Sequence, residues 1–152
     1  LAYALNVPVV NVPTLEAMAY NFYGTDKVIC PIMDARRNQV YTGIYSFENN
    51  GLSIYLDSSA MDIMELIPKL QEIDKPVIFT GDGIPVFRDI IDKGLKTPHE
   101  YGRAGFNRQR ASSVALLGAE LYKAGKTEKA EEHLPEYLRM SQAERERMEK
   151  NG

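Results

Sequence analysis

The sequence predicts an α/β fold: a mixed sheet that includes an antiparallel three-stranded meander, with helices on its faces. Three strand-like runs follow one another between residues 28 and 57, separated only by short polar turns. After residue 60 the apolar residues change from a strand period to a helical period. A meander followed by helix, strand, helix, an optional further strand and helix is an order in which helices cover a mixed sheet.

Before the meander, the sequence predicts the end of a helix at Leu1–Leu5, a short strand at Val7–Val12 and a helix capped by the Thr14 side chain. The apolar positions of this second helix share one face, and they are Leu15, Met18, Ala19 and Phe22. Gly24 is expected to end the helix.

The strands of the meander are predicted at Val28–Met33, Gln39–Phe47 and Leu52–Asp57. Pro31 lies inside the first of them, and because proline has no N–H we expect a bulge or a missing ladder bond there. An Asn-Asn-Gly sequence before Leu52 tolerates the positive φ of a hairpin turn.

The second half predicts helices at Met61–Ile73, Pro85–Asp92 and Ala111–Ala124, and a buried strand at Val77–Thr80. Their expected core positions are Ile63, Met64, Leu66, Ile67 and Leu70 in the first helix, and Val114, Leu117, Leu121 and Tyr122 in the last. The serine pairs 58–59 and 112–113 lie where caps are expected. Ser141 and Glu144 form a capping-box pattern in a charged tail.

Length and composition predict one domain of ordinary globular type. The chain has 152 residues, 44% of them hydrophobic and 26% charged, with a net charge of −3. This charge argues against a protein whose whole surface grips nucleic acid. No apolar run reaches the length of a bilayer-spanning helix, and the single cysteine, Cys30, lies in an apolar run where a thiol is usually buried. We therefore expect a cytoplasmic protein without a membrane partner.

The residue pattern offers little for a metal or a nucleophile. His99 and His133 are too far apart for a local ligand pair and are expected at the surface. No Gly-x-Ser-x-Gly elbow exists, and no spacing singles out a pair of acid–base carboxylates.

Two stretches are candidates for binding anions. "TGDGIP", with Gly81, Asp82 and Gly83, joins a strand to a helix, where backbone N–H groups can cradle a phosphate. The alternative is a flexible turn in which Asp82 bonds its own backbone. "YGRAGFNRQR" carries Arg103, Arg108 and Arg110 with two aromatic residues and no acid, which suits RNA contacts or, alternatively, a solvated loop.

Several segments in order resemble the bacterial TsaB (YeaZ) family: "LAYALNVPVVNVPTLEAMAYN", "ICPIMDARRNQVYTGIY", "TGDGI" and "PEYLR". The resemblance implies a ribonuclease H-like half of the actin/sugar-kinase/Hsp70 ATPase architecture. It also implies that residues 1–139 are a C-terminal subdomain with its entry helix and that 140–152 are a charged tail. The family's opening Asp-Thr-Ser strand and Gly-Pro-Gly segment are not in this sequence, so we expect them upstream.

The resemblance further implies a non-catalytic scaffold or dimerisation subunit of the complex that adds threonylcarbamoyl to the tRNA adenosine beside the anticodon. The implied partners are TsaD and TsaE homologues, a second copy in a homodimer, and tRNA through the complex. This chain alone is then expected to bind no cofactor, whereas ATP and a metal ion belong to TsaD.

The "DARRNQ" turn resembles a phosphate loop that has lost its function. Asp34 keeps the acid of active ATPases, but Arg36 and Arg37 replace small residues that let backbone amides approach a phosphate. Either arginine could still meet a phosphate or a partner carboxylate, or the turn could be a hairpin tip in solvent. Gln39 stands where many relatives have Glu.

Two other functions stay open. Relatives of this fold were grouped with glycoproteases, so an M22-type metallopeptidase or an ATP-dependent transferase is one. An RNA-binding module that uses residues 101–110 is the other.

Overall fold

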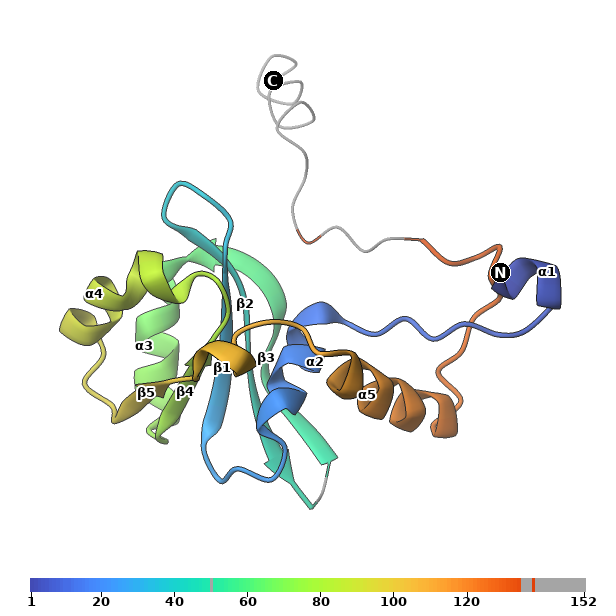
Figure 1. The fold of residues 1–152 in the computed structure, drawn as a ribbon. Coiled ribbons are helices and arrows are strands. Elements are labelled where there is room, and N and C mark those ends of the chain that lie inside the picture. Colours follow the sequence, from blue (N-terminus) through green and yellow to red (C-terminus); the bar gives the residue numbers. More distant parts are fainter. Residues whose placement is uncertain (50, 135–137, 139–152) are drawn as a thin grey trace, which may run out of the picture.

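The computed structural model describes residues 1–49, 51–134 and 138, and a five-stranded mixed sheet forms its centre (Figure 1). The strands are β1 (Val28–Asp34), β2 (Gln39–Glu48), β3 (Gly51–Asp62), β4 (Val77–Thr80) and β5 (His99–Tyr101). They lie in the order β3-β2-β1-β4-β5. The pairs β1–β2 and β2–β3 are antiparallel, whereas β1–β4 and β4–β5 are parallel. The predicted fold class is confirmed, and the optional strand exists as β5.

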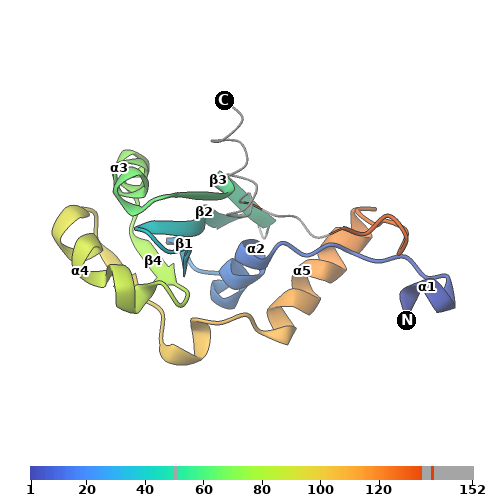
Figure 2. The ribbon, with the colours of Figure 1, turned by 90° about the horizontal axis from the view of Figure 1, so that it is seen from above.

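Helices cover both faces of this sheet. The helical elements are α1 (Ala2–Leu5), α2 (Thr14–Ala19), η1 (Tyr20–Phe22), α3 (Ile63–Ile73), α4 (Ile84–Gly94), η2 (Ala104–Phe106) and α5 (Ala111–Lys123). In Figures 1 and 2, α3 and α4 lie on one side of the sheet, while α2 and α5 lie on the other.

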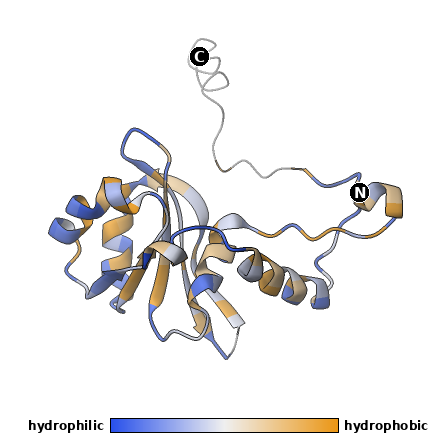
Figure 3. Ribbon diagram, viewed as in Figure 1, coloured by the Kyte–Doolittle hydropathy of each residue, from blue (hydrophilic) through white to orange (hydrophobic). Residues whose placement is uncertain are grey.

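Alternation along β1 explains this arrangement, because successive side chains of a strand point to opposite faces. Cys30 and Ile32 pack in the cluster that includes α3 and α4, whereas Ile29 packs against Leu15 of α2. Figure 3 shows hydrophobic residues concentrated along the central strands and a hydrophilic turn between β1 and β2. The near-continuous apolar character of β1 therefore reflects burial on both faces.

The proline in β1 produces no bulge. The pairs Ile29↔Tyr45 and Ile32↔Thr42 keep one register on both sides of Pro31. The Thr42 hydroxyl donates to the Pro31 carbonyl at 2.8 Å, so this part of the ladder keeps a hydrogen bond through a side chain. The register shifts instead between β2 and β3, around Ile44.

Strand β3 is longer than its sequence indicates. It continues beyond Asp57 to Asp62, because pairing with β2 extends to Met61↔Val40 and Asp62↔Gln39. Helix α3 therefore begins at Ile63 rather than at Met61. The Asp62 side chain caps it by accepting a hydrogen bond from Met64 N at 2.8 Å.

The predicted serine caps are wrong. Ser58 and Ser59 lie inside β3, where the Ser58 hydroxyl is 2.9 Å from that of Tyr45. At α5 the N-cap residue is Arg110, with no side-chain capping bond. The Ser113 hydroxyl instead donates to Asn21 Oδ1 at 2.7 Å.

The N-terminal segment also differs from its prediction. Residues 7–12 form no strand but a single bridge, between Val9 and Glu128. The N-cap of α2 is Pro13, with extended backbone, and no side chain caps the helix. Prolines 8 and 13 account for the first difference, because a residue without an N–H cannot donate to a ladder.

The apolar faces of two helices are narrower than predicted. In α3 the residues Ile63, Leu66, Ile67 and Leu70 are buried, but Met64 is exposed. In α5 only Leu117 of the expected core residues is buried, Leu121 is partly buried, and Val114 and Tyr122 are exposed.

Besides the packing of Leu117 with Ala17 and Tyr20, polar contacts hold helix α5 to the rest of the protein. The Tyr20 hydroxyl donates to Glu120 Oε2, and burial together with this hydrogen bond raises the pKa of Tyr20. Among the residues described, no helix is long and apolar enough to cross a membrane. The predictions for Ser141, Glu144 and most of the "PEYLR" segment fall outside the described residues.

Candidate functional site at the carboxyl edge of the sheet

The parallel pairing of β1 and β4 brings two predicted site segments to the same edge of the sheet. Pro31 pairs with Thr80, so the residues that follow each strand are neighbours. The Asp34 amide donates to Asp82 Oδ1 at 3.4 Å. Ligands of open α/β sheets bind outside the carboxyl ends of parallel strands, so this edge is the candidate site.

The glycines of the 81–83 turn are required by packing against β1. Gly81 has φ +116°, and a Cβ there would lie 2.1 Å from the Ile32 carbonyl oxygen. A Cβ at Gly83 would lie 2.9 Å from the same oxygen, which accepts the Gly83 amide at 3.0 Å. Asp82 bonds the Asp34 backbone and not its own, so that part of the alternative interpretation is wrong. These glycines therefore let the backbone of the 81–83 turn pack closely against β1.

The turn between β1 and β2 has a left-handed backbone without any glycine. Arg36, Arg37 and Asn38 have φ values of 67°, 54° and 61°. A non-glycine residue in this region costs about 1–2 kcal/mol. The turn is closed by hydrogen bonds from Ala35 N to Gln39 O at 2.9 Å and from Gln39 N to Arg36 O at 3.0 Å.

The Asp34 carboxylate is engaged within this turn. One oxygen, Oδ1, accepts the Arg36 amide at 2.8 Å, and the other, Oδ2, lies 3.4 Å from the Arg36 guanidinium. The Arg36 side chain is 87% exposed, so the ion pair contributes little to stability. The backbone hydrogen bond is the stronger contribution, and it makes Asp34 the residue that shapes the turn.

The third predicted segment approaches the same edge. A small hollow of about 50 Å³ is lined by Met18, Met33, Asp82, Asn107, Arg108 and Gln109. It places Arg108 beside Asp82, whereas Arg103 and Arg110 are exposed elsewhere on residues 101–110. Pockets for small-molecule ligands usually measure about 300–1,000 Å³, so the hollow holds no more than a few waters.

A larger cavity of about 430 Å³ lies between α1 and residues 127–132. None of the predicted site residues line it. In the described chain, the larger cavity and the predicted site residues therefore lie in different places.

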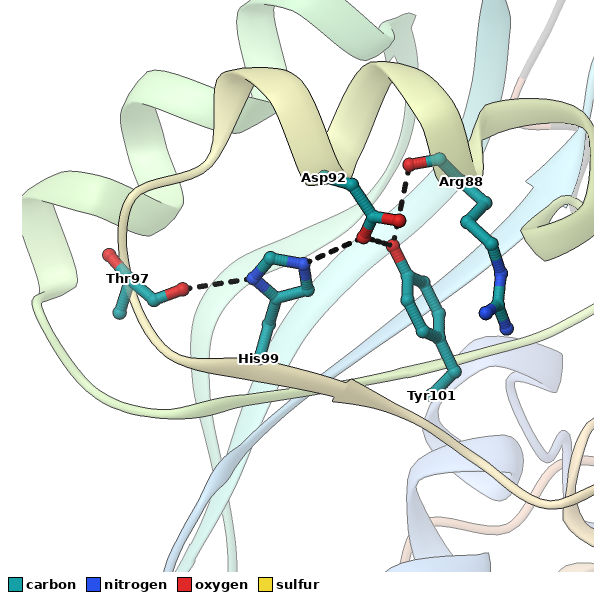
Figure 4. A network of polar contacts seen from close by, with 5 residues as sticks. All are labelled: Arg88, Asp92, Thr97, His99 and Tyr101. Atoms are coloured by element: carbon teal, nitrogen blue, oxygen red, sulfur yellow. Dashed lines mark hydrogen bonds and ion pairs between the residues drawn. The ribbon is translucent and has the colours of Figure 1, made fainter.

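A polar network that sequence reasoning missed joins β5 to α4 (Figure 4). Asp92 accepts a hydrogen bond of 2.6 Å from the Tyr101 hydroxyl, and its Oδ1 lies 3.0 Å from His99 Nε2. The Nδ1 of His99 lies 3.0 Å from the Thr97 carbonyl, and the Arg88 guanidinium stacks 4.0 Å from the Tyr101 ring centre. The hydrogen bonds from Tyr101 and then His99 lower the pKa of Asp92.

This network holds an edge strand against a helix. The His99 side chain is only 15% exposed, so the expected surface position of His99 is wrong. His133 is more exposed and pairs with Glu128. The available signal was the alternation of His99 and Tyr101, which places both side chains on one face of β5.

The described part of the chain has no side chains arranged to bind a metal or to activate a thiol. No cluster of three or more histidine, cysteine, aspartate or glutamate side chains is placed to hold a metal there. Burial raises the pKa of Cys30 to about 12, and its sulfur lies 3.5 Å from the Thr42 hydroxyl. The expected burial of the Cys30 thiol is confirmed.

Comparisons with known proteins give two related names, TsaD and TsaB. The family model described as "TsaD: tRNA N6-adenosine threonylcarbamoyltransferase" matches residues 1–147. The "tRNA threonylcarbamoyladenosine biosynthesis protein TsaB" of Bacillus subtilis (strain 168) is 36% identical over 146 residues, which cover 95% of this chain and 61% of that protein. The chain thus spans about three fifths of the length of this relative.

Two solved structures from Pseudomonas aeruginosa share the fold. One is an uncharacterized protein with similarity to peptidase YEAZ (TM-score 0.71, 20% identity, 91% of this chain and 62% of the other). The second is YeaZ itself (TM-score 0.69, 20% identity, 90% and 62%). The described residues therefore share the fold of these two structures. The chain therefore belongs to the family that the threonylcarbamoyltransferase (TsaD) model describes, and within it to the TsaB (YeaZ) proteins.

Proposed function

We propose that this chain is the TsaB-type scaffold subunit in the synthesis of threonylcarbamoyladenosine in tRNA, in partnership with a TsaD homologue. The observation that carries the proposal is the 36% identity to a protein named for that pathway, extending over 95% of this chain. The geometry at the sheet edge supports a binding role over a catalytic one, because both carboxylate oxygens of Asp34 already contact Arg36 of the same turn.

The same proposal assigns ATP and the metal ion to the TsaD partner, with no cofactor on this chain alone. A hollow of about 50 Å³ at the sheet edge supports this assignment, since a nucleotide needs several times that volume. A TsaE homologue and a second copy of the chain are further proposed partners, in the cytoplasm. The division into a C-terminal subdomain at 1–139 and a tail at 140–152 stays a prediction.

Arg36 and Arg37 are the proposed contacts with the partner. Both are exposed at the tip of the β1–β2 turn, which projects beyond the sheet (Figure 1). A guanidinium on a short, hydrogen-bonded turn suits a carboxylate or phosphate of the partner. Because the guanidinium is planar and rigid, it loses little conformational entropy for each hydrogen bond that it forms.

Co-purification tests the proposal. The tagged chain is co-expressed with the TsaD homologue of the same organism and isolated in the presence of ATP and magnesium, and we expect the two proteins to elute together. The variant Arg36→Glu with Arg37→Glu should weaken this association about tenfold or more. A control with Lys93→Glu and Lys96→Glu, which carries the same charge change on the α4 side, should not.

Two results would contradict the scaffold role. One is the absence of any association with TsaD under these conditions. The other is metal-dependent hydrolysis of ATP or peptide by the pure chain that Asp34→Ala abolishes, because it would make the chain an enzyme of the M22 or ATP-dependent class.

A further inference from the structure

Residues 101–110, the arginine loop, join β5 to α5 and form a locally basic surface on an acidic protein. The loop contains Arg103, Arg108 and Arg110, and no acidic residue follows until Glu120. All three arginine side chains are exposed. The loop runs into the N-terminus of the 13-residue helix α5, whose dipole adds positive potential at this end.

The backbone of the arginine loop is fixed from the inside. The Thr80 hydroxyl donates to the Phe106 carbonyl at 2.8 Å. The Asn21 side-chain amide donates to the carbonyls of Phe106 and Arg108 at 2.8 and 2.9 Å, and that of Asn107 donates to Gly102 O at 3.0 Å. A loop held in this way binds a ligand without first having to be ordered.

The charges of the loop are not compensated by ion pairs with other described residues. In the part of the chain that the structure describes, none of its three arginines forms an ion pair, whereas Arg36 pairs with Asp34. Asp82 lines the small hollow together with Arg108, but its carboxylate accepts the Asp34 amide and forms no ion pair with Arg108 in the described structure. Guanidinium groups on a rigid loop without acidic partners are suited to an external anion.

An aromatic and a guanidinium are already stacked beside these charges. The Arg110 guanidinium lies 4.8 Å from the centre of the Phe106 ring. Phe106 is 37% exposed, and its other contact, with the Phe22 ring at 5.8 Å, fixes the ring on the protein. Such a flat aromatic and cationic surface can stack on an unpaired base.

We propose that the arginine loop binds structured RNA: its arginines contact the phosphate backbone, and the Phe106–Arg110 pair stacks on an unpaired base. The identity of the RNA as tRNA rests on the proposed function, but the loop chemistry does not. An acidic protein would use the guanidinium groups equally well. RNA is favoured because an unpaired base offers a flat face that can stack on the Phe106–Arg110 pair, whereas an acidic side chain does not.

The test measures binding of unfractionated tRNA to the 152-residue chain at several salt concentrations. The variant Arg103→Gln, Arg108→Gln, Arg110→Gln should bind at least about tenfold more weakly, and its salt slope should fall by about 2–3, since each phosphate contact contributes about 0.7–0.9. The control Lys69→Gln, Lys93→Gln, Lys96→Gln removes three exposed charges from α3, α4 and the segment after it, and should bind like the parent.

A second variant separates stacking from charge. Phe106→Leu keeps an apolar contact with Phe22 and should weaken binding to a single-stranded oligonucleotide about tenfold, with little change for a duplex. Thermal unfolding of each variant shows whether the fold is intact.

The proposal is overturned if the parent does not bind RNA, or if both triple variants lose affinity equally. It is also overturned if polyaspartate binds as tightly as tRNA and depends on the same arginines, which would indicate an acidic protein partner. The co-purification test changes Arg36 and Arg37 and leaves these three arginines in place. Failure of the RNA test therefore leaves the scaffold role intact, and failure of co-purification leaves the RNA site intact.

Discussion

Two turns meet at the carboxyl edge of the sheet, and both use left-handed backbone, but only one uses glycine. In the 81–83 turn, Gly81 lies against the Ile32 carbonyl, where a Cβ would approach to 2.1 Å. In the β1–β2 turn, Arg36, Arg37 and Asn38 adopt positive φ with exposed side chains. Glycine is therefore required where neighbouring backbone leaves no room for a Cβ. It is not required where the only penalty is the free energy of a positive φ.

The largest effect is expected at Gly81. Gly81→Ala combines a strained φ with a clash against backbone and should lower the free energy of unfolding by about 3–5 kcal/mol. Gly24→Ala is the matched control, because Gly24 has φ +84° and nothing within 4 Å of an added Cβ. It should cost about 1 kcal/mol in urea unfolding, and equal losses at both sites would remove the distinction between crowded and open turns.

Removal of the acid from the β1–β2 turn should have an intermediate effect. Asp34→Ala deletes the acceptor for the Arg36 amide and should cost about 1–2 kcal/mol of stability. Asp34→Asn keeps an oxygen in that place, so its stability in the same unfolding assay should stay near that of the parent. An Asn variant as unstable as the Ala variant would show that the charge, and not the hydrogen bond, holds the turn.

A smaller change of opposite sign is expected at Arg37. Arg37→Gly relieves a left-handed conformation and should stabilise the chain by about 0.5 kcal/mol, after the extra freedom of glycine in the unfolded chain is subtracted. Arg37→Ala removes the same charge without relieving φ, and it should give no gain. Midpoints of urea unfolding for the two variants decide the matter, and a gain in both would point to charge repulsion.

A carboxylate outside the two turns gives the smallest effect. The folded pKa of Asp92 is lowered by its hydrogen bonds to Tyr101 and then to His99, so its contribution is present above its ordinary pKa of 3.8 and is lost as the pH falls through the lowered value. Asp92→Asn should therefore be less sensitive to acid than the parent below about pH 4. Asp89→Asn, on the same helix but outside the network of Figure 4, should follow the parent.

Sequence patterns were sufficient where one force dominated. The apolar runs of β1 and β4, and the helical stripe of α3, predicted the sheet and its covering helices because burial alone decides those positions. The path of residues 7–12 and the length of β3 could not be read in this way, since prolines and pairing with β2 override local propensity.

At the candidate site, the sequence identified the residues but not their partners. Asp34, Asp82 and Arg108 come close only because β1 and β4 are parallel neighbours and the arginine loop returns to their edge. The contact between Asp82 and the Asp34 amide and the network around Asp92 join residues distant in sequence, and no short motif encodes them.

The sparse attachment of α5 has a consequence for the motions of the molecule. Leu117, the Tyr20–Glu120 hydrogen bond and the Ser113–Asn21 hydrogen bond are its main ties to the body, whereas β1 is enclosed on both sides. Local opening of α5 therefore costs less free energy than opening of the sheet, and its amide hydrogens should exchange with solvent first. A ligand bound to the adjoining arginine loop would slow exchange of the amide hydrogens at the start of α5 and would leave exchange in the sheet unchanged.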